Sequence, residues 1–460
     1  MTTFSPSELD DNQSVWLADK PPYEPLPALA GDASADVAVI GGGFTGVSTA
    51  YHLAKRFPDK RIVLLEAKTL ANGASGRNGG LMLNWVNGAH PGDAEHAKEI
   101  FDATQEGMAV IESLIRDNAL AVRHRRDGAL EVFTSTKGAD KAAREVEKLA
   151  AVGIPLRWLG KSELADRVQV AGAQGAILDP TAGEIDGAAL VRAMRPVLVG
   201  LGVGIYEGTP VLKIAEGETI ALTTPAGTVR AKAIVLATNA YTPGLGYFSA
   251  SVCTVHSHVI ATEPLSADAW QDLGWGGVAG FSDDRDRLSY ASMTPDGRLV
   301  FGGGSNAAYS YVFGNRPSYR APAERSFDAI RDTMLSYLPR AREVRITHRW
   351  TGPVALTLSR ICTMGVRGAH RNVYYSLGYS GHGVTLANLA GKVLTDLYSG
   401  ADERWRAMPF LQQRLTYIPP EPLRWIGYQF YTKLTGRSPK QTLPDSALRP
   451  SATPPRKGST

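Results

Sequence analysis

A glycine-rich turn constrains the fold of this chain more than any other feature. Gly41-Gly-Gly-Phe-Thr-Gly46 follows the apolar run 36–40, which predicts a buried strand, and precedes residues 47–57, whose small and apolar residues share one helical face. The apolar run 62–65 then predicts a second, parallel strand. Strand, turn, helix and strand within about 30 residues form a βαβ unit. The sequence therefore predicts a Rossmann-type sheet that binds a dinucleotide.

The spacing of the glycines gives each of them a physical role. Gly41 permits the tight turn, Gly43 lets backbone N–H groups approach a pyrophosphate at the helix N-terminus, and Gly46 lets the helix lie close to the sheet. Glu66 stands twenty residues after Gly46, where its carboxylate can accept hydrogen bonds from ribose hydroxyls and would repel the 2′-phosphate of NADP. A glycine turn without a ligand is the alternative interpretation, and the turn alone does not separate NAD from FAD.

Size, charge and cysteine content narrow the class of protein. At 460 residues the chain can form two joined domains around a cofactor, and its net charge of +4 comes from basic residues spread among 45 acidic ones, which predicts no nucleic-acid partner. Residues 1–13 lack the apolar core of a signal peptide, and no stretch is apolar for the length of a membrane span, so we expect a cytoplasmic protein without a transmembrane segment. Cys253 and Cys362 form neither a CxxC pair nor a metal-ligand cluster. Redox chemistry would therefore come from a bound cofactor, with no metal site.

The pattern of elements predicts interleaved domains. Residues 14–35 contain four prolines and no helical or strand period, which predicts an extended arm. Alternating runs over 252–304 predict an antiparallel sheet, and residues 372–394 return to strand, glycine turn and helix. The predicted boundaries are an N-terminal arm at 1–35, a nucleotide-binding domain at 36–90, 169–250 and 350–400, a substrate domain at 91–168 and 251–349, a helical extension at 401–436 and a flexible tail at 437–460.

A second glycine-rich loop indicates the kind of dinucleotide. Gly73-Ala-Ser-Gly-Arg-Asn-Gly-Gly80 resembles the flavin-facing loop of the glycine/D-amino acid oxidase (DAO) family, with the closest likeness to its γ-glutamylputrescine oxidoreductase branch. Trp16, Ala237-Thr-Asn-Ala240 and Gly378-Tyr-Ser-Gly-His-Gly-Val384 resemble that branch at comparable places, so the match spans roughly residues 14–400. The resemblance implies an α/β fold in which a Rossmann-type FAD-binding domain of the glutathione reductase kind is interleaved with an antiparallel-sheet substrate domain of the D-amino acid oxidase kind.

The resemblance also implies which residues hold FAD. The attachment cysteine of some relatives would fall near Gly352, so we expect FAD to be bound non-covalently. Backbone N–H groups at the predicted helix start 381–385 would stabilise the anionic reduced flavin. For His382 the alternative is a turn residue whose side chain has other partners. The implied cofactor-binding residues are Gly41, Gly43, Phe44, Thr45, Gly46, Glu66, Ala67, Lys68, Ser75, Arg77, Asn78, Gly79, Gly80, Leu81, Val211, Ala237, Thr238, Asn239, Gly381, His382, Gly383, Val384 and Thr385.

The chemistry of the family is hydride transfer to the flavin from a carbon bonded to an amine nitrogen. The resemblance implies an amine or amino acid substrate with a CH–NH or CH–NH2 group, hydrolysis of the resulting imine, and reoxidation by O2 with release of H2O2. Because the cofactor carries the redox step, no acid–base pair need be present. Candidate catalytic residues are His382, Tyr290 and Trp350, and candidate substrate residues are Tyr290, Ser292, His348, Arg349 and Tyr379; for each aromatic, a packed core residue is the alternative.

Ser292 departs from the family pattern in a way that bears on the substrate. It stands where relatives often have an arginine, so the usual carboxylate anchor is missing. Arg285, Arg287 or Arg349 could bind a carboxylate or phosphonate instead, or could be solvated surface residues.

The electron acceptor is the remaining question. No lysine occurs between Lys232 and Lys392, so the flavin-side lysine that activates oxygen in sarcosine-oxidase relatives has no obvious counterpart. This favours slow use of O2, or a His or Arg as the positive group. Residues 422–435 place Leu423, Ile426, Phe430 and Leu434 on one helical face; peripheral membrane contact is one interpretation, and packing against the substrate domain is the favoured one. A quinone-linked amine dehydrogenase, an aminophosphonate oxidoreductase and a tRNA-modifying flavoprotein remain as alternative functions.

Overall fold

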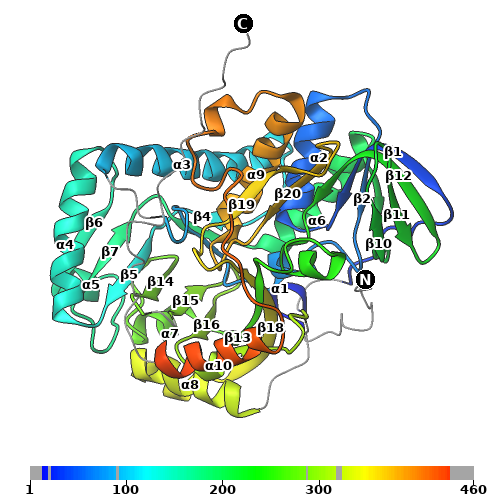
Figure 1. Ribbon diagram of the computed structural model, residues 1–460. Coiled ribbons are helices and arrows are strands. Elements are labelled where there is room, and N and C mark those ends of the chain that lie inside the picture. Colours follow the sequence, from blue (N-terminus) through cyan, green and yellow to red (C-terminus); the bar gives the residue numbers. More distant parts are fainter. Residues whose placement is uncertain (1–12, 19–21, 90–92, 286–287, 318–323, 436–460) are drawn as a thin grey trace, which may run out of the picture.

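The computed structural model describes residues 13–18, 22–89, 93–285, 288–317 and 324–435. Two large sheets dominate this part of the chain, one at the right of Figure 1 and one at its lower left. The predicted tail at 437–460 and Arg287 lie outside the described residues. The helices are α1 (Val15–Ala18), α2 (Phe44–Arg56), α3 (Ala94–Asp117), α4 (Thr136–Ala151), α5 (Lys161–Ala165), α6 (Gly187–Gly200), α7 (Ala267–Asp272), α8 (Glu324–Tyr337), α9 (Gly383–Ser399) and α10 (Leu423–Thr435).

The first sheet has eight strands and a parallel centre. Ile40 of β1 pairs with Leu65 of β2 and with Leu236 of β12, and Leu236 pairs with Tyr375 of β20. The carboxyl ends of these four strands therefore reach one edge of the sheet, from which the glycine turn starts. The strands in order are β10 (Lys213–Ala215), β11 (Ile220–Thr224), β12 (Gly227–Leu236), β1 (Ala33–Ile40), β2 (Ile62–Leu65) and β9 (Gly204–Tyr206), with β20 (Val373–Leu377) beside β12 and β19 (Thr363–Arg367) beside β20.

Helix α2 packs beside α9, and both helices contact the first sheet, α2 at β1 and β2 and α9 at β19 and β20. It begins at Phe44, three residues before the predicted start, because Gly43 already serves as its N-cap. Ser48 Oγ on α2 donates to the Asn388 carbonyl oxygen on α9 at 2.6 Å, and a Cβ at Gly391 would lie 2.2 Å from Ser48 Oγ. Glycine at this position therefore permits the close approach of the two helices, and the largest cluster of buried apolar residues surrounds them.

The second sheet has nine strands and differs from the predicted antiparallel sheet in one pair. Strands β14 and β5 run parallel, because they come from separate stretches of the chain and are not joined by a hairpin. Strand β7 pairs with β5 and β6 here, although residues 169–250 were predicted to belong with the first sheet. The strands in order are β17 (Tyr309–Tyr311), β13 (Cys253–Pro264), β16 (Arg298–Gly303), β15 (Ser289–Met293), β14 (Gly280–Asp283), β5 (Ala129–Phe133), β7 (Gly175–Asp179) and β6 (Arg157–Gly160), with β18 (Ile346–Leu356) beside β13.

A small third sheet joins the flavin-type loop to the rest of the molecule. Its strand order is β3 (Leu81–Met82), β8 (Gly183–Ile185) and β4 (His124–Arg125). Leu81, which directly follows the loop 73–80, pairs with Glu184 of β8. The loop is therefore held at its carboxyl end by a strand that sequence patterns did not reveal.

The N-terminal arm contains a helical turn that the sequence analysis did not predict. Residues 15–18 form α1, whereas residues 22–30 belong to no helix or strand. Trp16 is buried and donates its indole Nε1–H to the Asn78 carbonyl oxygen at 2.6 Å, and Ser14 donates its hydroxyl to the Gly76 carbonyl oxygen. These tertiary bonds to the loop 73–80 stabilise a turn that local sequence does not favour.

Helix α10 confirms the predicted helical segment but not its favoured orientation. Leu423, Ile426 and Phe430 are 60%, 52% and 65% exposed, so the apolar face does not pack on the second sheet. Arg424 and Thr432 are buried instead. The side chain of Leu434 lies outside the described residues. Within the described ranges, no helix is long and apolar enough to cross a membrane.

Candidate cofactor and substrate site

One cavity extends from the carboxyl edge of the first sheet to the inner face of the second. Its volume is about 370 Å³. Glu66 and Val211 line one end, the glycine turn lines the middle, and Tyr290 and Tyr309 of the second sheet line the other end. The cavity thus connects the two sheets, whose strands come from interleaved parts of the chain.

The backbone of the glycine turn leaves no room for side chains. Gly41 has a φ of +107°, and a Cβ there would lie 2.7 Å from the Ala237 carbonyl oxygen. A Cβ at Gly46 would lie 1.8 Å from the Gly41 carbonyl oxygen. These contacts give Gly41 and Gly46 the turn-forming and packing roles predicted from their spacing.

Glu66 is held rigidly at the end of β2. Its two carboxylate oxygens accept backbone N–H groups from Gly42 at 2.7 Å and from Lys68 at 2.9 Å. Burial raises the pKa of Glu66, whereas these two backbone hydrogen bonds act in the opposite direction. The carboxylate therefore both braces the glycine turn and lines the end of the cavity beside Thr209 and Val211.

The loop 73–80 is fixed on both sides. Ser75 Oγ accepts the Phe44 backbone N–H at 2.9 Å, which ties the loop to the first residue of α2. Arg77 is buried, donates its Nε–H to the Asn72 carbonyl oxygen at 2.9 Å and accepts the Trp350 indole N–H through its own carbonyl oxygen at 2.9 Å. The loop is thus a preformed wall of the cavity, anchored to both sheets.

The N-terminus of α9 forms the opposite wall. Gly381 has a φ of +93°, and His382 is the N-cap of the helix. The first N–H groups of a helix have no acceptor within the helix, so this end offers donors to an anionic ligand. Tyr379 shares hydrogen bonds of 2.6 Å with Thr45 Oγ1 and Ser376 Oγ, and burial raises the pKa of its phenol. These bonds hold the start of α9 against the glycine turn.

The end of the cavity on the second sheet is polar but carries few charges. Tyr290 lines it, and burial raises the pKa of this phenol to about 12, so its O–H stays protonated at neutral pH. Ser257 and Tyr309 lie in the same lining. Arg360 contributes the guanidinium at this end and donates from Nη2 to the Tyr431 hydroxyl of α10 at 3.2 Å.

Most of the residues implied by the resemblance line this cavity. Four of the cofactor residues do not: Gly46, Lys68, Gly80 and Thr385 lie behind the lining. Gly46 packs beneath the turn, the Lys68 backbone holds Glu66, and a Cβ at Gly80 would lie 2.8 Å from the Trp16 ring. The cofactor-type residues that do line it are Gly41, Gly43, Phe44, Thr45, Glu66, Ala67, Ser75, Arg77, Asn78, Gly79, Leu81, Val211, Ala237, Thr238, Asn239, Gly381, His382, Gly383 and Val384.

The candidate substrate residues divide into two groups. Tyr290 and Tyr379 line the cavity, whereas Ser292, His348 and Arg349 do not, and neither does the candidate catalytic residue Trp350. Ser292 is buried and donates its hydroxyl to the Gly79 carbonyl oxygen at 2.5 Å.

The other three belong to β18, where each side chain contacts other parts of the protein. His348 Nδ1 lies 2.9 Å from Thr347 Oγ1, and Arg349 stacks over the Phe327 ring. Trp350 is fully buried against Arg77. Trp350 was predicted as catalytic, but the structure gives it a supporting position behind the loop.

The polar residues at the end of the cavity on the second sheet could not be predicted from the sequence. Arg285, one of the proposed anion-binding arginines, does not line it and faces Asp283 at 3.8 Å. Arg360 lines it but has a φ of +62° in a loop without a recognisable pattern. Tyr431 comes from α10, more than 70 positions later in the chain. Only the tertiary structure brings these two side chains together.

The residues present fit a bound FAD. The glycine turn can bind a pyrophosphate through its backbone, Glu66 can bind a ribose, and the loop 73–80 can lie against a planar ring system. Neither Cys253 nor Cys362 lines the cavity, and a Cβ at Gly352 would lie 3.1 Å from Arg77 Cβ. Space for a covalent attachment at Gly352 is therefore small.

Comparisons with known proteins agree with this geometry. A family model described as FAD dependent oxidoreductase (DAO) matches residues 36–397. The gamma-glutamylputrescine oxidoreductase of Escherichia coli (strain K12) is 31% identical over 432 residues, which cover 89% of this chain and 96% of that protein. A probable oxidoreductase OrdL of Haemophilus influenzae is 28% identical over 424 residues, which cover 88% of this chain and 93% of that protein.

Solved structures show the same fold. The glycine oxidase of Geobacillus kaustophilus superposes with a TM-score of 0.70 at 21% identity, covering 83% of this chain and 99% of that one. The L-proline dehydrogenase of P. horikoshii gives 0.68 at 18% identity, covering 84% and 97%.

Proposed function

The chain belongs to the DAO family of FAD-dependent oxidoreductases, and from this premise we propose that it oxidises the C–N bond of an amine or amino acid. The observation that carries the proposal is the single cavity that connects the dinucleotide cradle of the first sheet to the polar lining of the second. A substrate bound against Tyr290 and Arg360 would share this enclosed space with the cofactor. Such an arrangement suits direct transfer between two bound molecules.

The cofactor and the residues of the cavity would contribute differently to the reaction. FAD, when bound, supplies the hydride acceptor, so the substrate carbon loses a hydride and its nitrogen forms a C=N bond that water then hydrolyses. The α9 N-terminus at 382–385 offers N–H donors and a partial positive charge to the anionic side of the cofactor. The protonated phenol of Tyr290, which lines the cavity, would donate a hydrogen bond to the substrate.

We also propose that FAD is bound non-covalently and that its flavin and adenosine parts bind at different ends of the cavity. Non-covalent binding is supported by the absence of both Cys253 and Cys362 from the lining. The wall at Ser75, Arg77 and Asn78 would bind the flavin part, and the end at Glu66 would bind the adenosine part. The two cysteines are free, which suits the reducing cytoplasm that we propose as the location.

Arg360 narrows the proposed substrate class. Apart from Arg77, whose side chain is directed into the protein, Arg360 is the only lysine or arginine in the described lining of the cavity, and it lies at the polar end. Glu66, the only acidic lining residue described, lies at the far end. We therefore propose an amine that carries an anionic group at some distance from the reacting nitrogen, such as the carboxylate of a γ-glutamyl amine.

An anaerobic titration tests the proposal. The yellow holoprotein is mixed with a panel of amines, with and without a remote carboxylate, and flavin bleaching is followed at its visible absorption band. We expect bleaching by carboxylate-bearing amines and, after O2 is admitted, recovery of the yellow colour with H2O2. Protein that purifies without flavin, or holoprotein that no amine bleaches, would refute the proposed function. Recovery over many minutes would instead indicate another electron acceptor.

Substitution of Arg360 tests the substrate class separately. Arg360→Ala should raise KM for carboxylate-bearing amines about 10- to 100-fold, because a charge-assisted hydrogen bond is lost, and should leave KM for neutral amines nearly unchanged. Arg345→Ala is the matched control, since this exposed arginine pairs with Glu263 away from the cavity. An equal change for both classes of amine would contradict the role of Arg360 but not the function.

A further inference from the structure

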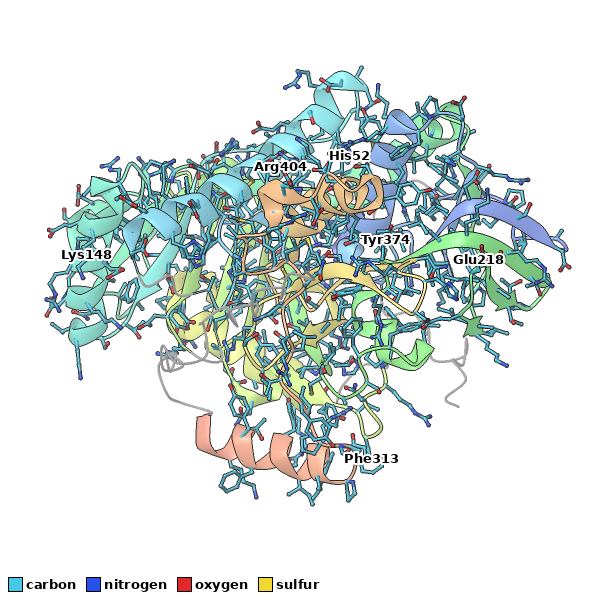
Figure 2. All side chains as sticks on the ribbon, turned by 45° about the horizontal axis from the view of Figure 1, so that its top comes forward. His52, Lys148, Glu218, Phe313, Tyr374 and Arg404 are labelled. Carbon is cyan, nitrogen blue, oxygen red and sulfur yellow. The ribbon has the colours of Figure 1, made fainter. Side chains whose placement is uncertain are left out.

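The exposed large apolar side chains of the described residues gather around one helix. Nine such side chains are exposed by 40% or more, and five of them belong to α10. Phe313, 58% exposed, lies beside the start of this helix in Figure 2, where the neighbouring Gly314 N–H donates to Glu421 Oε1 at 3.1 Å. Leu423, Ile426 and Phe430 share one face of the helix, and an exposed apolar face of this kind marks an interaction site. The five residues on the helix are Leu423, Trp425, Ile426, Phe430 and Tyr431.

The opposite side of α10 explains why the apolar side faces outward. Arg424 donates to the carbonyl oxygens of Pro419 at 3.0 Å and Ser249 at 2.5 Å, and the Thr432 carbonyl oxygen accepts from Asn306 Nδ2 at 2.6 Å. Tyr428, one turn from each, stacks on Tyr311 with ring centroids 5.2 Å apart. These specific contacts hold the helix in one rotation, so the exposure of its apolar face is built into the fold.

The sequence of α10 and of the segment that follows it is basic. The sequence of α10 contains Arg424 and Lys433 and no acidic residue. Glu421, the acidic residue just before the helix, accepts hydrogen bonds from the Tyr311 hydroxyl and from the Gly314 and Trp425 N–H groups, the last two at 3.1 Å. The sequence that follows, 436–460, has five basic residues and one acidic residue, a net charge equal to the +4 of the whole chain.

We propose that the exposed face of α10, defined by Leu423, Ile426 and Phe430, binds the surface of an anionic lipid bilayer. An amphipathic helix with large apolar side chains on its outer face inserts at the boundary between head groups and acyl chains, and adjoining basic residues add attraction to anionic lipids. A second copy of the chain is a poorer occupant, because a symmetric contact would bring two segments of charge +4 together. An anionic surface complements this charge.

Docking through α10 would place the bilayer close to the catalytic cavity. Tyr431 belongs both to this helix and to the cavity lining, and its hydroxyl accepts from Arg360 at 3.2 Å. The rim of the cavity would therefore lie beside the lipid surface. The inference does not depend on the proposed reaction, since the exposed face and its charge are present whatever the substrate.

Vesicle sedimentation with the full-length holoprotein tests the proposal. Vesicles of phosphatidylcholine alone are compared with vesicles that also contain phosphatidylglycerol, at low and high salt. We expect sedimentation with the anionic vesicles and loss of most of the bound fraction at high salt. The double variant Ile426→Asp, Phe430→Asp should lower the partition coefficient at least ~tenfold, the factor that burial of one such side chain contributes.

A control variant and a measurement of oligomeric state distinguish lipid binding from dimer formation and from misfolding. Val199→Asp, at another exposed apolar residue (51% exposed) on α6, should bind as the wild type does. Both variants should keep their flavin content and melting temperature, because the altered side chains are exposed. Failure to bind anionic vesicles, or unchanged binding by the double variant, would overturn the proposal. So would a concentration-dependent dimer in light scattering that the double variant abolishes, since a second copy would then cover the face.

Discussion

Replacement of Gly43 by alanine separates cofactor binding from folding. Gly43 has a φ of −94°, which any residue adopts, so its backbone needs no glycine. A Cβ there would lie 2.7 Å from Ser75 Oγ. The hydroxyl can rotate away, but it would then lose the hydrogen bond that it accepts from the Phe44 N–H. We expect this loss to cost the apoprotein about 1 kcal/mol of unfolding free energy.

The effect on FAD affinity should be larger. The added methyl group stands where the pyrophosphate must approach the start of α2. Loss of one charge-assisted N–H···O bond costs about 1.5–3 kcal/mol, which corresponds to a ~10- to ~100-fold increase in Kd. Titration of apoprotein with FAD, followed by quenching of flavin fluorescence, measures Kd, and thermal melting of the apoprotein by circular dichroism measures folding.

Two further variants make the test specific. Gly200→Ala at the end of α6 is the control, since a Cβ there meets nothing within 4 Å. The double variant Gly43→Ala, Ser75→Ala relieves the contact with the hydroxyl while leaving the methyl group in the cavity. If the double variant recovers wild-type affinity, displacement of Ser75 explains the effect and the pyrophosphate assignment loses its support. A Kd for Gly43→Ala within about threefold of the wild type would refute the reasoning.

Three further predictions follow from the same contacts. Gly46→Ala should prevent folding, because its Cβ would lie 1.8 Å from a backbone oxygen; a native circular dichroism spectrum and melting transition would contradict this. Trp350→Phe should raise Kd for FAD about tenfold with the fold retained, because the Arg77 carbonyl oxygen loses its indole donor; unchanged FAD binding would show that the loop does not need this bond. Burial raises the pKa of Glu184 from 4.5 to about 7, although Arg125, whose Nη2 lies 2.8 Å from Glu184 Oε1, acts in the opposite direction. Between pH 4.5 and 7 the folded state therefore holds a proton that the unfolded state releases, and the stability from this group is present below pH 4.5 and lost as pH rises through 7. Relative to Glu184→Gln, the wild type should lose up to roughly 3 kcal/mol between pH 4.5 and pH 8 in urea unfolding, and parallel pH profiles of the two proteins would contradict the buried carboxyl.

Local sequence patterns predicted the elements that are built from contiguous residues. Strand β2 has the predicted bounds, and the glycines 41–43 lie between β1 and α2, although the helix begins three residues earlier than predicted. Such elements are readable because their hydrophobic period depends only on neighbours along the chain. The resemblance of the two glycine-rich loops then pointed to the family that the comparisons show.

Elements set by distant contacts were less predictable. Helix α1 depends on the bonds of Ser14 and Trp16 to a loop some sixty residues later. Strand β7 joined the second sheet because its partners, β5 and β6, come from an earlier part of the chain. The outward rotation of α10 depends on polar contacts of Arg424 that outweigh the usual burial of an apolar stripe.

The difference between what the sequence determined and what the tertiary structure decided is clearest in the cavity. By itself the sequence determined the cofactor end, because a pyrophosphate and ribose are recognised by backbone and one carboxylate at fixed spacing along a βαβ unit. Only the tertiary structure decided which residues form the end of the cavity on the second sheet, where Arg360 from a loop lies beside Tyr431 from α10. Side chains that converge from separate strands and helices leave no periodic trace in the chain, because their spacing is a property of packing and not of sequence order.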